Sequence, residues 1–542
     1  MPQVQTRYIT HRFSGGWATD LGKLVTGLPT ETADFLIPYA LEAQNIFWQL
    51  DGGFRKIGGT GPIGDQLESG DVVYGVYDYW KTGTTGSHTQ RKVCHISTKI
   101  KQDQGNNTWT DLKTGLEDNK HPSYATFDDL LIIASESTTD VPMSWDQSTF
   151  QNLAGTPPNF AFSCKHRAHH WASGVVSTPS SVYYSVPNDP EDWASAASGS
   201  IVCDPGDGDE VRGIASYKNE LWVFKGPNKG SIHRITGSAE ADFARSTFIE
   251  GIPAAGHSTI VTMKDDLIFM TPTGSIRSLK ATAAFGDYHE AALSFPIEAW
   301  LKDNINPAAT KRAWAVNDSR ASRLYFAVPT GSSTTNDTLL CYDYGFRSIN
   351  QPDRWSKITA WNAHSLGVYM DASQRKVMGG GTDGYVRELN NNTKAIDTTT
   401  EIRARVDTPN MNYGSVSAQS KTLVSVGITL TPAGNDDLRF YWTRDSVYEQ
   451  QAAMDQGFEG VLLGDANSPT PEDFTLGDSA DATTGDYLFG LTFREIYYEP
   501  QDGGEARWMQ YSIRNEDVDE DLYVHALSTG IRFGEINMEN VE

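Results

Sequence analysis

Residues 127–134 read FDDLLIIA: two aspartates that suit a tight turn, followed by a short run of strand-forming residues. The arrangement returns three times, as YKNELWVF (217–224), MKDDLIFM (263–270) and SRLYFAV (322–328). Each copy indicates an inter-strand turn that leads into an apolar strand. The chain is therefore expected to repeat one small antiparallel unit.

Weaker copies bring the series to seven; they are KVCHI (92–96), HRAHHWA (166–172) and QRKVMG (374–379). The aligned position falls at residues 93, 130, 168, 221, 267, 324 and 377, so successive copies are 37, 38, 53, 46, 57 and 53 residues apart. A period of about 40–50 residues, with three or four short strands per unit, is typical of a β-propeller. We expect six or seven blades, because one hairpin can complete a blade across the closure of the ring. A large β-sandwich with irregular hairpins is the alternative.

The sequence predicts an all-β protein in three parts. The propeller covers residues 67–392, and residues 1–66 form an N-terminal arm that docks on the propeller or closes it. Alternating apolar runs in residues 400–542 predict a separate C-terminal β-sandwich. Long helices are nearly absent, and segment 295–305 is the best candidate for one. Leucines at the aligned positions are expected to be buried in equivalent places; they are Leu130, Leu221, Leu267 and Leu324.

The composition excludes several classes of function. Lys and Arg number 44 against 69 Asp and Glu, which gives a formal net charge of −25. Tight non-specific binding of nucleic acid needs basic residues to neutralise phosphates, so this chain is expected to repel a polyanion. We expect neither a membrane-spanning segment nor a secretory signal, because no apolar run of the required length occurs. The cysteines form no CxxC pair and are expected to be free thiols; they are Cys94, Cys164, Cys203 and Cys341.

Two clusters contain residue types that bind metal ions. In HRAHH (166–170), three histidines lie close together, but no nearby Cys or Asp completes a zinc shell, and the segment falls on a repeat position. In DPGDGDE (204–210), four acidic residues surround glycines, but the spacing is not that of a calcium-binding EF-hand loop. We interpret the first as a blade strand and the second as an inter-strand turn.

Signatures of catalysis are missing from the sequence. No GxSxG, HExxH or P-loop pattern occurs, and the glycine-rich GGGTDG (379–384) opens no helix that would bind phosphate. A glycosidase would need two carboxylates that converge across a cleft, and nothing in the sequence marks such a pair. We therefore predict a protein that is not an enzyme and that has no catalytic residue, cofactor or metal site. A hydrolase stays open as an alternative.

The N-terminal stretch AQNIFWQLDGGFRKIGG (43–59), preceded by FSGGWATD (13–20), resembles the N-terminal region of tail proteins from short-tailed bacteriophages. Its matching residues are Ala43, Asn45, Phe47, Gly52 or Gly53, Arg55, Lys56 and Gly58. Further matching segments follow in the same order: SSVYYSVPNDPEDW (180–193), GDGDEVRGI (206–214), LWVFK (221–225), GIPAAGHSTI (251–260) and FMTPTGSI (269–276). The resemblance covers residues 13 to about 280 and extends only loosely to the C-terminal part.

The family that these segments resemble comprises the tail nozzle or hub proteins, also called packaged-DNA stabilisation proteins. The resemblance implies a β-propeller subunit, made in the host cytoplasm and located in the virion tail, that forms a ring of six around the DNA channel. Such a ring lies below the portal and adaptor proteins, carries tail fibre or tail needle proteins, retains the packaged genome and conducts it during ejection. A propeller that binds a glycan or receptor on the host surface is the alternative function.

On the nozzle hypothesis the acidic composition has a use. Six copies of −25 give −150, and carboxylates near a channel wall would let DNA slide without sequence-specific binding. Acidic proteins of salt-adapted organisms have a similar composition. Candidate wall loops are 204–210, 226–230 and 330–337, and the candidate channel-lining residues are Asp204, Asp207, Asp209, Glu210 and Lys229. An acidic insert at 464–486 has no counterpart in the family.

Overall fold

The computed structural model describes residues 6–536 with several gaps. The gaps are residues 12, 14, 20–23, 26–38, 84–85, 286–291, 346–353, 394, 398, 412, 414–418, 432–436, 446–447, 456–458, 463–475, 479–487, 490–493, 501–504 and 516–520. Strands make up about 53% of the molecule and helices about 6%, so the protein is all-β. The chain divides into two compact units, and each is discontinuous in sequence.

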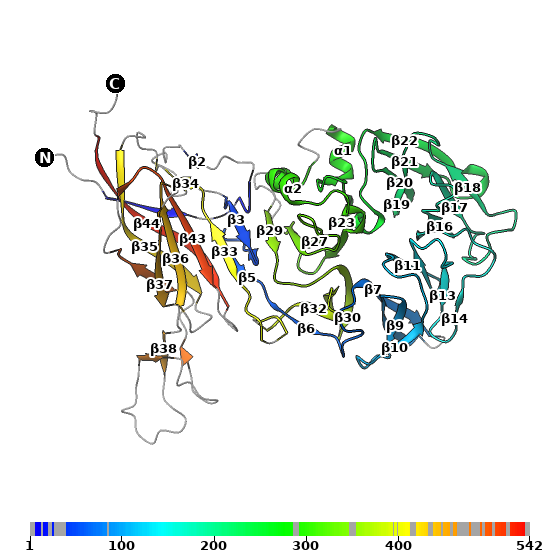
Figure 1. Cartoon of the computed structure of the whole chain (residues 1–542), viewed down its shortest axis with the longest axis horizontal. Coiled ribbons are helices and arrows are strands. Elements are labelled where there is room, and N and C mark those ends of the chain that lie inside the picture. Colours follow the sequence, from blue (N-terminus) through cyan, green and yellow to red (C-terminus); the bar gives the residue numbers. More distant parts are fainter. Residues whose placement is uncertain are drawn as a thin grey trace, which may run out of the picture. The chain divides into compact units, whose positions relative to one another are not determined.

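Residues 61–341 and 361–389 form the first unit, a β-propeller whose described residues build seven small antiparallel sheets (Figure 1). Blades one to four have four strands each: β7 (Val73–Thr82), β8 (His88–Ile96), β9 (Lys99–Asp103) and β10 (Trp109–Lys113); β11 (Pro122–Phe127), β12 (Leu130–Ser135), β13 (Met143–Trp145) and β14 (Phe150–Asn152); β15 (Phe162–His166), β16 (His169–Ser173), β17 (Ser181–Tyr184) and β18 (Gly199–Val202); β19 (Glu210–Tyr217), β20 (Glu220–Gly226), β21 (Ser231–Thr236) and β22 (Ala244–Glu250).

The remaining three blades are less regular. Blade five has three strands, β23 (Val261–Met263), β24 (Asp266–Met270) and β25 (Ile276–Ser278), and blade six contains β26 (Trp314–Asp318), β27 (Arg323–Val328) and β28 (Thr338–Asp343). Blade seven consists of β30 (Ser365–Asp371), β31 (Gln374–Gly380), β32 (Val386–Asn391) and β6 (Gly59–Pro62). A single strand from the start of the chain therefore completes the last blade, where the sequence predicted a hairpin.

The first strands of the blades surround the axis of the propeller. Contacts run from β7 to β11, β15 and β19 in turn, then from β23 to β26 and β30, and β30 contacts β7. The 3-10 helix η2 (His257–Thr259) contacts both β19 and β26 and fills the place between them. The ring is closed, so no first strand is left as an exposed edge.

Tight hairpins between the first and second strands explain the sequence repeat. Asp128 and Asp129 join β11 to β12, Lys218 and Asn219 join β19 to β20, and the pair 372–373 joins β30 to β31; all six residues have positive φ. Two central residues with positive φ are typical of a type I′ turn, whose twist matches that of paired strands. Two polar pairs of the repeat, Asp128-Asp129 and Lys218-Asn219, are such turns.

The structure corrects one position of the repeat alignment. Leu221, Leu267 and Leu324 are buried. Each pairs with the penultimate residue of the preceding strand; Leu221, for example, pairs with Ser216. In blade two that place belongs to Leu131, which pairs with Thr126, whereas Leu130 pairs with Phe127 at the end of the hairpin and is only partly buried. The error of one residue arose because two leucines follow the turn.

Helices are short and lie in the second half of the propeller. The predicted helix at 295–305 is present as a 3-10 turn, η4 (Phe295–Ile297), that continues into α2 (Glu298–Asn304). Two other helices were not predicted from the sequence, α1 (Leu279–Phe285) and η5 (Thr310–Arg312), and a further 3-10 turn is η1 (Glu240–Asp242).

Residues 1–60, 342–360 and 390–542 form the second unit. One of its sheets has the order β4-β5-β44-β35-β41, with β1 on β44 and β42 on β35; the other contains β2-β34-β43-β33-β3-β29, with β36 and β37 beyond β43. The bounds are β1 (Thr6–His11), β2 (Leu24–Val25), β3 (Glu42–Gln44), β4 (Ile46–Trp48), β5 (Phe54–Lys56), β29 (Arg354–Ile358), β33 (Ala404–Asp407), β34 (Asn410–Met411), β35 (Gln419–Thr431), β36 (Asp437–Arg444), β37 (Tyr448–Asp455), β41 (Arg494–Tyr498), β42 (Glu505–Ala506), β43 (Met509–Asn515) and β44 (Tyr523–Ile536). A small additional sheet comprises β38 (Glu459–Leu462), β39 (Leu476–Asp478) and β40 (Leu488–Phe489).

The two large sheets pack face to face as a sandwich. Tyr413 donates or accepts hydrogen bonds with Tyr511 of one sheet and Thr529 of the other, and the Trp442 ring lies 5.9 Å from that of Tyr498 in the opposite sheet. Blue N-terminal strands lie among the yellow-to-red C-terminal ones (Figure 1). The sequence predicted three consecutive segments, whereas the structure assigns most of residues 1–60 to the sandwich because β1, β3 and β5 pair with C-terminal strands. Most of the acidic insert at 464–486 lies outside the described residues.

Candidate functional site

The N-terminal motif at 43–59 ties the sandwich together. Asn45 has a left-handed backbone (φ 55°), and its side-chain oxygen accepts hydrogen bonds from the amides of Thr359 and Ala360 at 2.8 and 3.2 Å. Its side-chain nitrogen donates to the carbonyl of Arg403 at 2.7 Å. One asparagine thus joins three segments that are far apart in the chain.

Charged residues of the motif have partners in the C-terminal strands. Arg55 donates to the Asp521 carboxylate from Nε at 3.1 Å and from Nη2 at 2.5 Å, and the buried Lys56 ammonium donates to Asn515 Oδ1 at 2.6 Å. A Cβ at Gly53 would lie 2.2 Å from the Val524 carbonyl oxygen, so a larger residue does not fit there. These contacts give the motif a structural role.

The acidic loop 204–210 surrounds a lysine. Lys225 is fully buried, and its ammonium donates to Asp207 Oδ2 and the Asp204 carbonyl at 2.7 Å, to the Cys203 carbonyl at 2.8 Å and to Ser180 Oγ at 3.3 Å. The ammonium occupies the centre of the oxygen cluster where a cation would lie. Burial by itself would raise the pKa of the Asp207 carboxyl. The hydrogen bond and the positive charge of Lys225, together with the Asp209 backbone amide, outweigh burial and hold this pKa below its usual range.

The other candidate channel-lining residues are also largely engaged within the chain. Asp204 accepts from Arg245 at 2.6 Å, and Glu210 pairs with Arg212 at 2.9 Å. Asp209 is buried and accepts hydrogen bonds from the amides of residues 228, 229 and 230. The Lys229 side chain is exposed. The structure therefore brings all five together around one inter-strand loop, with Asp209 turned inward.

The histidines of HRAHH lie in the β15–β16 hairpin. Their Nδ1 atoms lie 2.8 Å from Ser216 Oγ for His166, 2.6 Å from the Ser185 carbonyl oxygen for His169 and 3.5 Å from the Pro190 carbonyl oxygen for His170. Burial lowers the pKa of His166 and of His170 to about 4. Across the described part of the chain, no group of three or more His, Cys, Asp or Glu side chains is placed to hold a metal ion.

Rings from four blades meet on the axis of the propeller. Tyr74, His121 and His364 lie at the starts of β7, β11 and β30, and their ring centroids are 5.3 to 6.0 Å apart. His121 of blade two also lies 6.5 Å from Trp314 of blade six. These two blades are not neighbours in the ring, so the side chains meet across the axis and fill it at this level.

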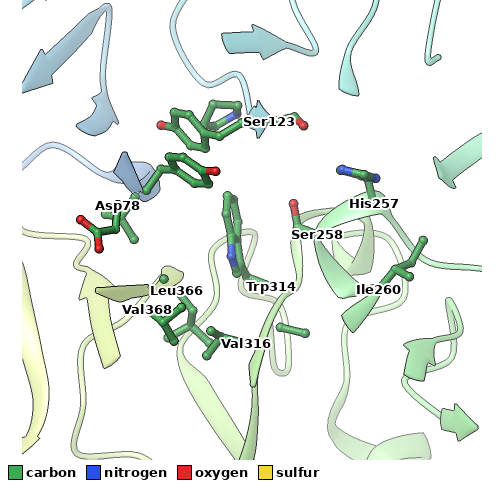
Figure 2. Close-up of a pocket in the computed structure, with 15 residues that line it drawn as sticks. Asp78, Ser123, His257, Ser258, Ile260, Trp314, Val316, Leu366 and Val368 are labelled. Carbon is green, nitrogen blue, oxygen red and sulfur yellow. The ribbon is translucent and has the colours of Figure 1, made fainter. Parts of the chain in front are cut away.

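A cavity of about 460 Å³ adjoins these rings and shares Trp314 with them (Figure 2). Its lining comes from the first strands of blades one, two, six and seven and from η2. Trp314 projects into the middle of the view, with Asp78 on one side and His257 and Ser258 on the other. This volume is in the range of small-molecule sites.

The polar groups of the cavity differ in how they are engaged. Asp78 accepts from Gln90 Nε2 and Trp80 Nε1, each at 2.8 Å, and from the Met370 amide at 3.1 Å; burial raises the pKa of its carboxyl. By contrast, within the described residues no partner bonds Ser123 Oγ, Ser258 Oγ or Trp314 Nε1. The sequence interpretation missed this site. Its one signal was GIPAAGHSTI (251–260), which contributes His257, Ser258 and Ile260.

The fold defines the class of this molecule: a β-propeller with a β-sandwich. No protein-family model and no curated protein sequence matches the chain. Among solved structures, one described as "YCF48 bound to D1 peptide" is similar, with 9% sequence identity and a TM-score of 0.35; the match covers 60% of this chain and 94% of that one. No helix in the described ranges is both long enough and apolar enough to cross a membrane.

Proposed function

We propose that this protein is a structural component of a bacteriophage tail, a nozzle or hub subunit that forms a ring around the DNA channel. The supporting observation is the role of the residues that carry the resemblance. Asn45 and Lys56 hold the sandwich, and the hydrogen bond from Lys225 to Asp207 holds two matching segments, 206–214 and 221–225, together. Polar residues of these motifs form hydrogen bonds between distant segments of the chain. Such cross-links suit a structural protein that must withstand the pressure of packaged DNA.

On this proposal DNA passes between copies of the chain and not through the propeller. The axial cavity has the volume of a small-molecule site, and the rings of Tyr74, His121, His364 and Trp314 fill the axis beside it. A DNA duplex, whose major groove alone is about 12 Å wide, does not fit such a space. The channel of a nozzle must therefore be built by the ring of subunits.

The proposed assembly in the virion contains six copies of this chain. The portal and adaptor proteins lie above the ring, and tail fibre or needle proteins are attached to it. Each subunit boundary is expected to bury well over about 1,000 Å², because weaker contacts would not hold a pressurised channel. The acidic surface is expected to conduct DNA without reading its sequence. Asp204, Asp207 and Glu210 are less free for this task than the sequence suggested, since each has an internal partner.

Negative-stain images and mass photometry of the full-length protein test this proposal. We expect six-fold rings with a central hole that admits a DNA duplex, and little DNA affinity at 150 mM salt. A protein that stays monomeric at every concentration, or rings without such a hole, would overturn the nozzle function. Tight DNA binding with a steep salt dependence would contradict a channel through which DNA slides and would indicate a protein that clamps DNA.

A second function, a propeller that binds a ligand of the host surface, is favoured by the cavity with its unengaged polar groups. This function does not require a ring.

A further inference from the structure

The axial cavity offers no free charge to a ligand. Its carboxylate, Asp78, already accepts three hydrogen bonds from Gln90, Trp80 and Met370. Its histidine, His257, stacks on Phe162 at 4.8 Å, and its Nδ1 accepts from the Ile214 amide at 3.4 Å. Burial lowers the pKa of His257 to about 4, so the ring is neutral at pH 7. A charged ligand would lose its hydration without gaining a counter-charge.

Hydrogen-bonding groups of the cavity remain unused. Ser123 Oγ is buried and has no hydrogen-bond partner among the residues that the structure describes, which is uncommon for a buried hydroxyl. Ser258 Oγ and Trp314 Nε1 likewise have none among the described residues, and His257 carries its proton on Nε2 because Nδ1 is an acceptor. Ser123 belongs to blade two, Ser258 to η2 and Trp314 to blade six, so these groups surround the cavity (Figure 2).

Flat apolar surfaces complete the lining. The Tyr77 and Tyr124 rings are stacked, with centroids 5.2 Å apart and planes at 15°. The Trp314 indole and aliphatic side chains that include Val316 and Leu366 also line the cavity. A ring with one apolar face and a rim of hydroxyl groups matches such a site: its C–H face lies on the aromatic rings while its hydroxyls meet the serine and indole groups.

We propose that the axial cavity binds a neutral pyranose, either as a free sugar or as the terminal unit of a glycan. The inference deepens the second function above and is independent of ring formation. Trp314 provides the stacking face and a donor, and Ser123 and Ser258 provide hydroxyls.

Ligand-detected NMR and calorimetry on the full-length protein test the inference. The probes are methyl pyranosides of glucose, galactose and mannose, each also offered as the terminal unit of a tetrasaccharide, with glucuronate and sialic acid as charged comparisons. We expect binding of at least one neutral pyranoside, in preference to the charged sugars. Binding of both forms assigns the site to glycan ends, and binding of the monosaccharide alone assigns it to free sugars.

Variants locate the binding. Ser258→Ala and Trp314→Phe each remove one donor and are expected to weaken binding about 3- to 10-fold. Ser258→Leu fills the cavity and should abolish binding. The matched controls are Ser148→Ala, on an exposed turn, and Trp193→Phe, at a partly buried ring that lies outside the cavity lining; both should bind like the wild type.

Three results would overturn the inference: no neutral sugar bound by wild-type protein, charged sugars preferred, or binding unchanged in Ser258→Leu. Mass photometry of the same samples reports ring formation separately. Rings without sugar binding would leave the nozzle function standing, and sugar binding without rings would leave only the inference.

Discussion

At the scale of single residues, buried polar groups connect parts of the chain that apolar packing alone would leave adjustable. The Lys225 ammonium of blade four has four oxygen partners in blade three and in the loop that follows it, which compensates for the cost of burying its charge. Asn45 does the same without charge in the sandwich.

The two leucines after the first turn of blade two allow a test of register. Leu131 is fully buried against Tyr79, Ile133 and Trp145, whereas Leu130 faces the other side of the strand and is only partly buried. Leu131→Ala should lower the free energy of unfolding by about 2–5 kcal/mol, and Leu130→Ala by less than about half as much. Urea denaturation of the two variants measures the difference. Equal losses would contradict the register described here.

At the scale of elements, the propeller is closed by a short segment that runs along blade seven. After β6, the Ile63 amide donates to the Val386 carbonyl at 2.8 Å and the Leu67 amide to the Gly384 carbonyl at 2.9 Å. Gly384 has a positive φ of 82°, and a Cβ there would lie 1.7 Å from the Glu68 carbonyl oxygen. The closure thus depends on a turn that only glycine allows.

Gly384→Ala should therefore disturb the closure. The left-handed backbone costs roughly 1–2 kcal/mol for a residue with a Cβ, and the displacement of the 63–68 segment adds roughly 1–3 kcal/mol. Gly206→Ala is the matched control, because Gly206 has a φ of 83° but nothing within 4 Å of the added carbon. In thermal and urea unfolding, the wild type should be the most stable, Gly206→Ala should be less stable, and Gly384→Ala should be the least stable. If the two variants were equally stable, the close contact with Glu68 would have no part in the closure.

At the scale of the whole molecule, histidines are buried in the neutral form in several blades of the propeller. Burial lowers the pKa to about 4 for His95, His166, His170 and His257 and to about 3 for His121 and His364. The unfolded chain has an ordinary histidine pKa near 6.5 and binds more protons than the folded one below that pH. Their contribution to stability is complete above about pH 6.5 and is lost as the pH falls towards 4.

We therefore expect the free energy of unfolding to decrease between pH 6.5 and 5, before most carboxylates are protonated. At pH 5 each buried histidine accounts for roughly 1–2 kcal/mol of this loss. His95→Phe should lower the number of protons taken up on unfolding by about one, because it removes one titrating group. Among the described residues neither nitrogen of His95 has a hydrogen-bond partner, so the change breaks no hydrogen bond of the side chain. His88→Gln, at an exposed position of β8, is the control and should leave the slope unchanged. Denaturant unfolding at several pH values measures the slope, and a flat profile from pH 7.5 to 5 would contradict the expectation.

The sequence by itself determined the hairpin repeat and hence the propeller, because a two-residue turn and the strand after it are local features. It also identified 204–210 as a loop, although it could not reveal Lys225 at its centre, since that lysine belongs to another strand. The tertiary structure alone decided three things. It placed residues 1–60 and 342–360 with the C-terminal strands, it set the register that separates Leu131 from Leu130, and it built the axial cavity. Each of these features depends on pairing or packing between segments that are distant in the chain. Such contacts form because they bury apolar surface across the whole molecule, and a short stretch of sequence does not specify them.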